Sequence, residues 1–182
     1  YYLRNGEIKQ AVLRLDSAIS LVSKKKLRIR YKYIQAQLCQ EIGQNNKASD
    51  LYEYVARKSG TYQMVFYSKI NRALLASSSN RPALKKDLLE LAKDEKYIEF
   101  RDQIYYALAD IELRNANEKE GINYLEKSAS YPPSNKTQKG KTFLRLADVY
   151  FDNKDYVPAQ KYYDSTLSEL DNESAKYVQI KD

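Results

Sequence analysis

Two cations at helical spacing are the clearest chemical feature of this sequence. Lys141 and Arg145 are four residues apart, so on a helix their side chains share one face. Donors that converge there hold a carboxylate through charge-assisted hydrogen bonds, which predicts a docking site for an acidic partner segment. Asp148 offers a competing interpretation, because it can pair with either cation as an ordinary surface ion pair.

A second cationic feature is the run formed by Lys24, Lys25, Lys26, Arg28 and Arg30, called the basic patch below. It predicts a surface for an acidic protein, a nucleic acid or lipid headgroups. The alternative is a solvated turn together with a helix C-terminus, where the helix dipole favours cations. The net charge of +7 over 182 residues favours acidic partners or anionic surfaces without by itself indicating nucleic acid.

The residue types needed for catalysis are missing. The chain has no histidine, which excludes Ser-His-Asp and Cys-His nucleophile systems and most zinc sites. Cys39 is the only cysteine, and we expect it to be a buried core residue. No glycine-rich phosphate loop or metal-spaced acidic cluster occurs, and Glu118 and Glu120 flank a polar turn. We therefore predict a protein that is not an enzyme and needs no cofactor or metal.

The elements that must position these residues repeat along the chain. Three series of residues recur in step, with spacings of 36 to 38: Ala36, Ala73, Ala109, Ala147; Leu15, Tyr52, Leu89, Leu125, Tyr163; and Ala18, Val55, Ala92, Ser128, Thr166. Such a fixed period is the sequence signature of a repeat architecture.

Each period contains two amphipathic helices. In the last one, 143, 146, 147 and 150 form a helical apolar stripe, a polar break follows at 152–155, and a second stripe follows the break. This predicts one all-α array with a half-repeat at 1–23, full repeats at 26–58, 61–93, 98–131 and 137–171, and a further helix beginning in 172–182. With 5 Gly and 4 Pro, the chain has too few turn residues for an all-β fold.

The residues at these positions resemble the tetratricopeptide repeat. The best-matching repeat contains Leu146, Ala147, Tyr150, Asp155, Tyr156, Ala159, Tyr163, Thr166 and Leu167. The resemblance implies an α-solenoid, a right-handed superhelix of antiparallel helix pairs with a period of about 37 residues. The repeat at 61–93 departs from the pattern at Arg72 and Lys85, and its second helix is expected to use Leu84, Leu88 and Leu91 instead.

The resemblance also implies that the first helix of each repeat lines a concave groove for a protein partner. The groove positions are Arg30, Tyr33, Gln37, Tyr67, Asn71, Leu74, Gln103, Tyr106, Asp110, Lys141, Arg145 and Asp148. Asn71, Lys141 and Arg145 resemble a carboxylate clamp, although Gln103 and Ala107 interrupt it. The alternative is that Tyr33, Tyr106 and Arg145 only pack against a neighbouring repeat.

Two stretches, 91–109 and 154–167, resemble the repeat region of SprE/PorW-type outer-membrane lipoproteins. This narrower resemblance implies a periplasm-facing scaffold in gliding motility and type IX secretion. No run approaches the roughly 18 apolar residues of a membrane span. The chain opens with Tyr1 and no Met, so we expect a piece of a longer protein. Protein binding in the groove is the predicted function, and nucleic-acid or anionic-surface binding through the basic patch is the alternative.

Overall fold

The structure is a computed structural model that describes residues 6–134 and 136–169. Within these residues it contains nine α-helices, one 3-10 helix and no strand. Within each of the two compact units described below, helices that follow one another in sequence pack as neighbours, and the prediction of an all-α fold is confirmed. The predicted further helix at 172–182 and the first five residues of the half-repeat 1–23 lie outside the described residues.

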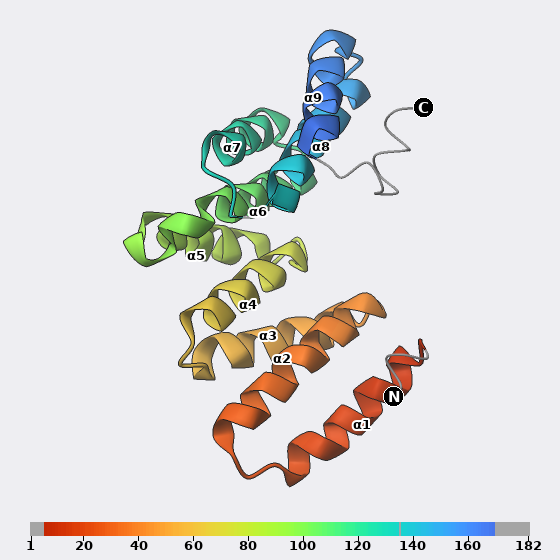
Figure 1. The fold of residues 1–182 in the computed structure, drawn as a ribbon, viewed down its shortest axis with the longest axis vertical. Helices are drawn as coiled ribbons and strands as arrows, with labels where there is room; N and C mark the ends of the chain where they lie inside the picture. The colour runs from red at the N-terminus through yellow and green to blue at the C-terminus, as the bar shows by residue number, and fades with distance from the viewer. Residues whose placement is uncertain (1–5, 135, 170–182) are drawn as a thin grey trace. The chain divides into compact units, whose positions relative to one another are not determined.

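The chain divides into two compact units, and the division falls after Asn80. The first unit contains four helices: α1 (Ile8–Leu21), α2 (Lys25–Glu41), α3 (Asn45–Lys58) and α4 (Tyr62–Leu74). Within this unit α1 packs against α2, α2 against α3 and α3 against α4, and Figure 1 shows α2 lying beside α3.

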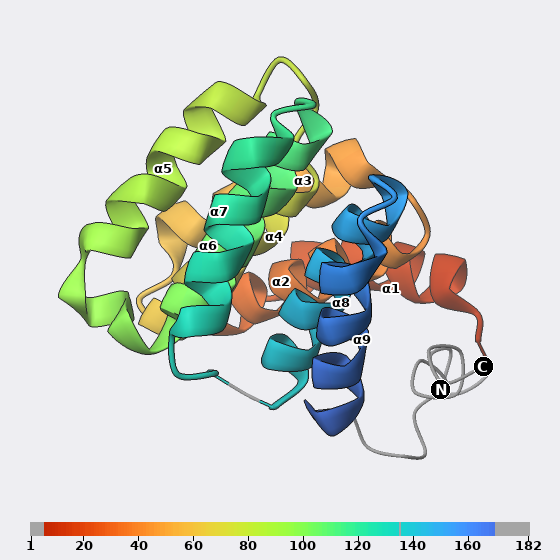
Figure 2. The same ribbon diagram turned by 90° about the horizontal axis from the view of Figure 1, so that it is seen from above.

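The second unit contains five α-helices and one short helix: α5 (Arg81–Lys93), the 3-10 helix η1 (Glu95–Phe100), α6 (Arg101–Arg114), α7 (Glu118–Ser130), α8 (Lys136–Asp152) and α9 (Tyr156–Glu169). Helices α6 and α7 form one hairpin and α8 and α9 another, as both ribbon views show (Figure 2). Contacts between α6 and α8 join the two hairpins.

Three hairpins close with the same turn. Gly43, Ala116 and Lys154 adopt left-handed backbone angles, with φ of 75°, 57° and 63°. After each of them, a backbone N–H donates to the carbonyl five residues earlier: Gln44 to Cys39, Asn117 to Glu112 and Asp155 to Tyr150, at 2.8 to 2.9 Å. This six-residue closure satisfies helix carbonyls that would otherwise lack partners. The polar breaks in the sequence therefore become tight helix C-caps.

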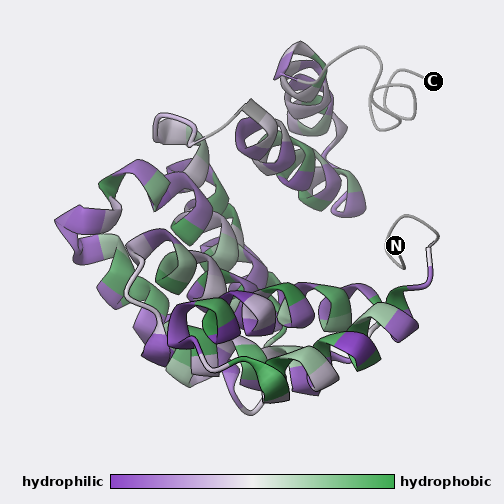
Figure 3. Ribbon diagram, turned by 60° about the horizontal axis from the view of Figure 1, so that its bottom comes forward, coloured by the Kyte–Doolittle hydropathy of each residue, from purple (hydrophilic) through white to green (hydrophobic). Residues whose placement is uncertain are grey.

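Small residues lie at helix contacts in the core of each unit, among larger buried side chains such as Tyr52 and Leu108. Ala36, Ala73, Ala109 and Ala147 lie in α2, α4, α6 and α8, and each is at most 1% exposed. Hydrophobic and hydrophilic residues alternate in bands along the helices, as expected when one face of each helix packs against its neighbours (Figure 3). Cys39 is fully buried, and burial raises its pKa, so the prediction of a core cysteine is confirmed.

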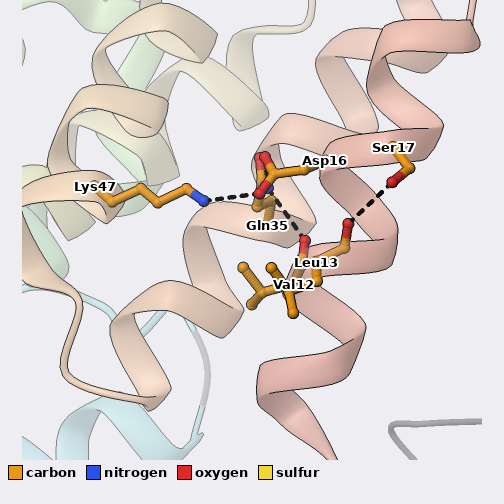
Figure 4. A network of polar contacts seen from close by, with 6 residues as sticks. All are labelled: Val12, Leu13, Asp16, Ser17, Gln35 and Lys47. Carbon is orange, nitrogen blue, oxygen red and sulfur yellow. Dashed lines mark hydrogen bonds and ion pairs between the residues drawn. The ribbon is translucent and has the colours of Figure 1, made fainter.

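A polar network at the edge of the core connects α1 to α2 and α3, with Gln35 buried and Asp16 exposed. Asp16 accepts a hydrogen bond from Gln35 Nε2 at 2.6 Å and forms an ion pair with Lys47 at 2.9 Å (Figure 4). Burial raises the pKa of the Asp16 carboxyl, but the hydrogen bonds from Lys47 and Gln35 and the nearby positive charges outweigh it, and the pKa falls below 3.8. Gln35 also donates to the Val12 carbonyl at 3.5 Å, which ties the network to the α1 backbone.

The unit boundary falls inside the predicted repeat 61–93. Helix α4 belongs to the first unit and α5 to the second. After α4 the backbone N–H of Ala76 donates to Ala73, without the left-handed closure of the other three hairpins. Helix α5 buries Leu84, Leu88 and Leu91, the residues that the sequence assigns to its packed face. None of the helices in the described ranges combines the length and apolar character needed to cross a membrane.

Candidate partner-binding site

Helices α6 and α8 bring together five of the predicted groove residues. Tyr106 and Asp110 come from α6, while Lys141, Arg145 and Asp148 come from α8. All except Lys141 are half-buried, and Lys141 is exposed. Helical spacing aligns the side chains of each helix on one face, and the contact between the two helices sets these faces beside each other. We call this surface the α6–α8 face.

Asp110 is a partly desolvated carboxylate surrounded by guanidinium groups. Burial raises its pKa above 3.8, and the positive charges of Arg114, Arg145 and Arg81 reduce this rise without cancelling it. Arg114 is one turn along α6, with Nη2 2.9 Å from Asp110 Oδ2. Arg81 is held nearby because its Nη1 donates to the Arg114 carbonyl at 2.9 Å and to Asn115 Oδ1 at 2.8 Å.

Arg145 is a cation on this face whose guanidinium donors are not used by the described residues. Among the residues that the structure describes, its side chain forms no hydrogen bond and no ion pair, although it is half-buried. It acts only through space: its charge lowers the pKa of Asp110 and of Tyr106, and in both groups the opposing effect of burial is larger. A half-buried guanidinium with unused donors favours an anionic ligand, because its lost hydration is then replaced.

Asp148 is not the partner of the two cations. In residues 6–134 and 136–169 it forms no ion pair with Lys141 or Arg145, so the ion-pair interpretation is wrong for this structure. Its Oδ1 instead accepts a hydrogen bond from the Tyr163 hydroxyl at 3.1 Å. Tyr163 lies on α9, so Asp148 links the two helices of the last hairpin and leaves the Arg145 donors open.

The predicted groove residues of the first unit are partly used within the fold. Arg30 is exposed on α2, and Tyr67 is half-buried on α4. The Tyr33 ring packs edge-to-face against Tyr52, with 5.9 Å between centroids, so the packing alternative applies to part of its surface. Burial raises the pKa of the Tyr52 hydroxyl, and the Asn71 side chain lowers it by a smaller amount. Asn71 thus belongs to the first unit, whereas Lys141 and Arg145 belong to the second.

Gln103 is buried, although the sequence predicted that it would line the groove. It is only 9% exposed, and its Nε2 donates to Ser134 Oγ at 2.7 Å. Ser134 in turn donates to the buried Asp102 carboxylate, so Gln103 completes an internal network at the start of α6. Strict repeat register placed it on the surface, but Gln103 lies in the first turn of α6, directly after the 3-10 helix, and is held by this network.

The basic patch lies at the opposite end of a helix from the one that the sequence suggested. Lys24 is the N-cap of α2, Lys25 and Lys26 open its first turn, and Arg28 and Arg30 follow, so the dipole interpretation is wrong. The helix N-terminus disfavours cations, and the first turn of α2 has no acidic residue. All five are exposed except Arg28, which is half-buried.

Sequence reasoning missed Arg81 and Arg114 because neither belongs to the repeat pattern. The Arg81 contact with the end of α6 depends on how α5 packs on α6, which no local signal reports. The Arg114–Asp110 pair is local, because the two residues are four apart on one helix, so their spacing could have indicated it. Within the described part of the chain, no three Cys, Asp or Glu side chains gather closely enough to hold a metal ion. The sequence matches no known protein-family model, and a search of curated proteins finds no similar chain.

Proposed function

We propose that this protein is a protein-interaction scaffold in which helix pairs form a tetratricopeptide-like α-solenoid. The support for the solenoid is the in-step residue series and the hairpin turns at Gly43, Ala116 and Lys154, which share one closure. Stacked helix pairs bury their apolar faces on each other and leave extended surfaces for partners. The proposal places the partner segment on the α6–α8 face.

The open donors of Arg145 carry this proposal. A half-buried arginine beside Tyr106 combines the two residue types that most often dominate interface energies. Lys141, exposed one turn away, extends the positive surface toward an approaching chain. The partner chemistry that fits is an acidic side chain or a terminal carboxylate, because either one fills the unused guanidinium donors.

The resemblance of 91–109 and 154–167 to SprE/PorW-type lipoproteins supports a more specific proposal. In it, the scaffold works in the cell envelope, facing the periplasm, in a motility and secretion assembly. A photo-crosslinking amino acid at exposed Lys141, in the full protein in its own cells, identifies the partner and its compartment together. The same group at exposed Lys161 on α9 is the matched control.

Purified partner then tests the site. Arg145→Ala is expected to weaken binding at least tenfold, roughly 1.4 kcal/mol, because a charged hydrogen-bonded contact is lost. Lys161→Ala removes one exposed charge of the same sign and is expected to leave the affinity unchanged. If Arg145→Ala binds the captured partner normally, docking on the α6–α8 face is wrong and the basic patch becomes the next candidate.

The second candidate function is binding of nucleic acid or another anionic surface through the basic patch. Its support is the cluster of cations at the positive end of the α2 dipole without an acidic residue in the first turn. Titration with single-stranded RNA tests it: sub-micromolar affinity that falls steeply with added salt supports this function. The variant K24Q/K25Q/K26Q must then lose that affinity, whereas weak RNA binding that it leaves unchanged rejects the candidate.

A further inference from the structure

A cavity of ≈ 580 Å³ lies in the second unit, between the 3-10 helix η1 and the turn that joins α7 to α8. Ile98, Phe100 and Arg101 line one side, and Tyr131 and Pro133 line the other. The volume falls within the roughly 300–1,000 Å³ of small-ligand sites. The cavity wall is mostly apolar, which suits a hydrophobic group.

Hydrogen bonds fix the Tyr131–Ser134 wall of the cavity. The Ser134 backbone N–H and hydroxyl both donate to Asp102 Oδ2, at 2.6 and 2.7 Å. Gln103 Nε2 donates to the Ser134 hydroxyl, and the Tyr131 ring stacks on Tyr105 with 5.4 Å between centroids. Asp102, the acceptor of both Ser134 bonds, is only 2% exposed, which strengthens these bonds, and this wall is already formed without a ligand.

Packing and one hydrogen bond fix the other wall. Tyr97 and Phe100 are each 6% exposed and anchor η1 in the core. Arg101 Nε donates to the Ala92 carbonyl at 3.1 Å, and its Cζ lies 5.8 Å from the centre of the Tyr131 ring. These contacts hold the guanidinium at the cavity wall and use one of its five donors.

The remaining donors of Arg101 are open. Among the described residues its side chain has no carboxylate partner and no hydrogen bond besides the one to Ala92. Arginine stays charged at every physiological pH, so the cavity has a fixed cation set beside apolar walls. Glu99 lines the same cavity, and its negative charge opposes an incoming carboxylate, so binding of a carboxylate there depends on Arg101.

The rim of the cavity is open to solvent. Ile98 is 58% exposed, and Pro132 and Pro133 are also exposed, so a bound group is not enclosed on all sides. An open rim suits a ligand that continues beyond the cavity, as an extended polypeptide does. A small molecule sealed from water would instead need walls on every side.

We propose that this cavity binds a peptide segment of a protein partner in which an apolar side chain stands next to a carboxylate. The apolar side chain fills the space between Phe100 and Pro133, and the carboxylate accepts hydrogen bonds from Arg101. This site shares no residue with the α6–α8 face. Peptide binding in the cavity can therefore be tested independently of partner docking on that face.

Two capped peptides test the proposal: Ac-Gly-Phe-Asp-Gly-NH2 and its neutral isostere Ac-Gly-Phe-Asn-Gly-NH2. Both are titrated into the isotopically labelled full chain and followed by amide NMR shifts. The Asp peptide is expected to shift Ile98, Arg101 and Tyr131 and to bind about tenfold more tightly than the Asn peptide, since a charge-assisted hydrogen bond contributes about that factor.

Four variants sharpen the test. Arg101→Gln is expected to remove the preference for Asp, and Ile98→Glu, at an exposed position that leaves folding intact, is expected to abolish binding of both peptides. Glu99→Gln is expected to strengthen binding of the Asp peptide. Lys96→Gln removes one exposed charge on η1 outside the cavity and is expected to change nothing.

Equal binding of the two peptides overturns the carboxylate part of the proposal. Shifts that map elsewhere, or no binding at millimolar peptide, overturn the site altogether. If Arg101→Gln unfolds, the comparison of the two peptides on the unmodified chain and on Ile98→Glu still decides the outcome.

Discussion

Lys85 on α5 places its ammonium group 2.7 Å from the carboxylate of Glu112 on α6, and the Glu112 side chain is only 5% exposed. The hydrogen bond to Glu112 raises the pKa of Lys85, which shows that the pair favours its charged form. Asn117 Nδ2 donates to the other carboxylate oxygen at 2.7 Å. The departure of Lys85 from the repeat pattern is therefore explained by the charge of Glu112 that it neutralises.

Lys85→Ala is expected to destabilise the protein by about 2 kcal/mol. Removing one partner leaves a buried carboxylate uncompensated, which costs roughly 3–5 kcal/mol in fully buried pairs. Here Lys85 is 33% exposed, so water replaces part of the interaction. Urea unfolding followed by circular dichroism measures the change.

The exposed pair Lys47–Asp16 is the matched control. Its side chains are 42% and 48% exposed, and such pairs contribute roughly 0.2–1 kcal/mol. Lys47→Ala is therefore expected to cost less than Lys85→Ala. Equal costs for the two variants would contradict the assignment of Glu112 as a desolvated charge.

Asp16 and Asp110 are expected to affect stability in opposite directions as the pH changes. The pKa of Asp16 is below 3.8, so its carboxylate stabilises the fold above that value and loses this effect as the pH falls through the folded pKa. The pKa of Asp110 is above 3.8, so the native state holds this proton longer than the unfolded chain. The contribution of Asp110 to folding stability therefore decreases as the pH rises from about 3.8 through its higher folded pKa.

Comparison of two variants over about pH 3 to about pH 6 measures both effects. Relative to the unmodified chain, Asp16→Asn is expected to lose stability as the pH rises, and Asp110→Asn is expected to gain it. Carboxyl NMR titration of the unmodified chain provides the order of the two pKa values directly. The same sign of change for both variants would refute the assignment.

The hairpin turns predict stabilising substitutions. Ala116 and Lys154 have positive φ, which strains residues with a Cβ and suits glycine. Ala116→Gly and Lys154→Gly are each expected to relieve roughly 0.5–1 kcal/mol of backbone strain in the folded state. The net gain in stability is smaller, because glycine also increases the conformational entropy of the unfolded chain. Thermal unfolding monitors the change.

Gly43 supplies the reverse experiment. A Cβ there meets no atom within 4 Å, so Gly43→Ala tests backbone strain alone. It is expected to destabilise by about 1 kcal/mol. A neutral result at Gly43 together with no gain at Ala116 would show that the turns relax and that the shared closure is not energetically important.

Arg145 and Ala147 separate binding from folding. Arg145 has no hydrogen bond within the described residues, so Arg145→Ala is expected to leave the melting temperature nearly unchanged. Ala147, two residues away, is fully buried, and Ala147→Glu is expected to unfold its hairpin because a charge enters a packed helix contact. A large loss of stability in Arg145→Ala would mean that this side chain supports the fold and is not reserved for a partner.

The sequence alone predicts the helices of this protein because their signals are local. Apolar stripes at helical spacing and polar breaks near Gly43 and Asp155 identify most hairpins before any contact is known. Small residues such as Ala36 and Ala147 indicate close helix packing, and the structure buries them fully. The shared face of Lys141 and Arg145 also follows from spacing on one helix.

Tertiary structure decides which of these side chains remain open. Asp148 is close in sequence to Arg145 and is a plausible partner, yet its hydrogen bond to Tyr163 depends on how α9 packs on α8. The sequence suggests a helix C-terminus for the basic patch, whereas the structure places the patch at the N-terminus of α2. The sequence is misleading here because Lys24–Arg30 has no apolar stripe that locates the helix start.

The cavity beside Arg101 has no sequence signature, because its two walls are about 30 residues apart in sequence and are joined by tertiary contacts such as those of Ser134 with Asp102 and Gln103. Local periodicity encodes the helices, whereas the partners of charged side chains depend on contacts between helices that are distant in sequence.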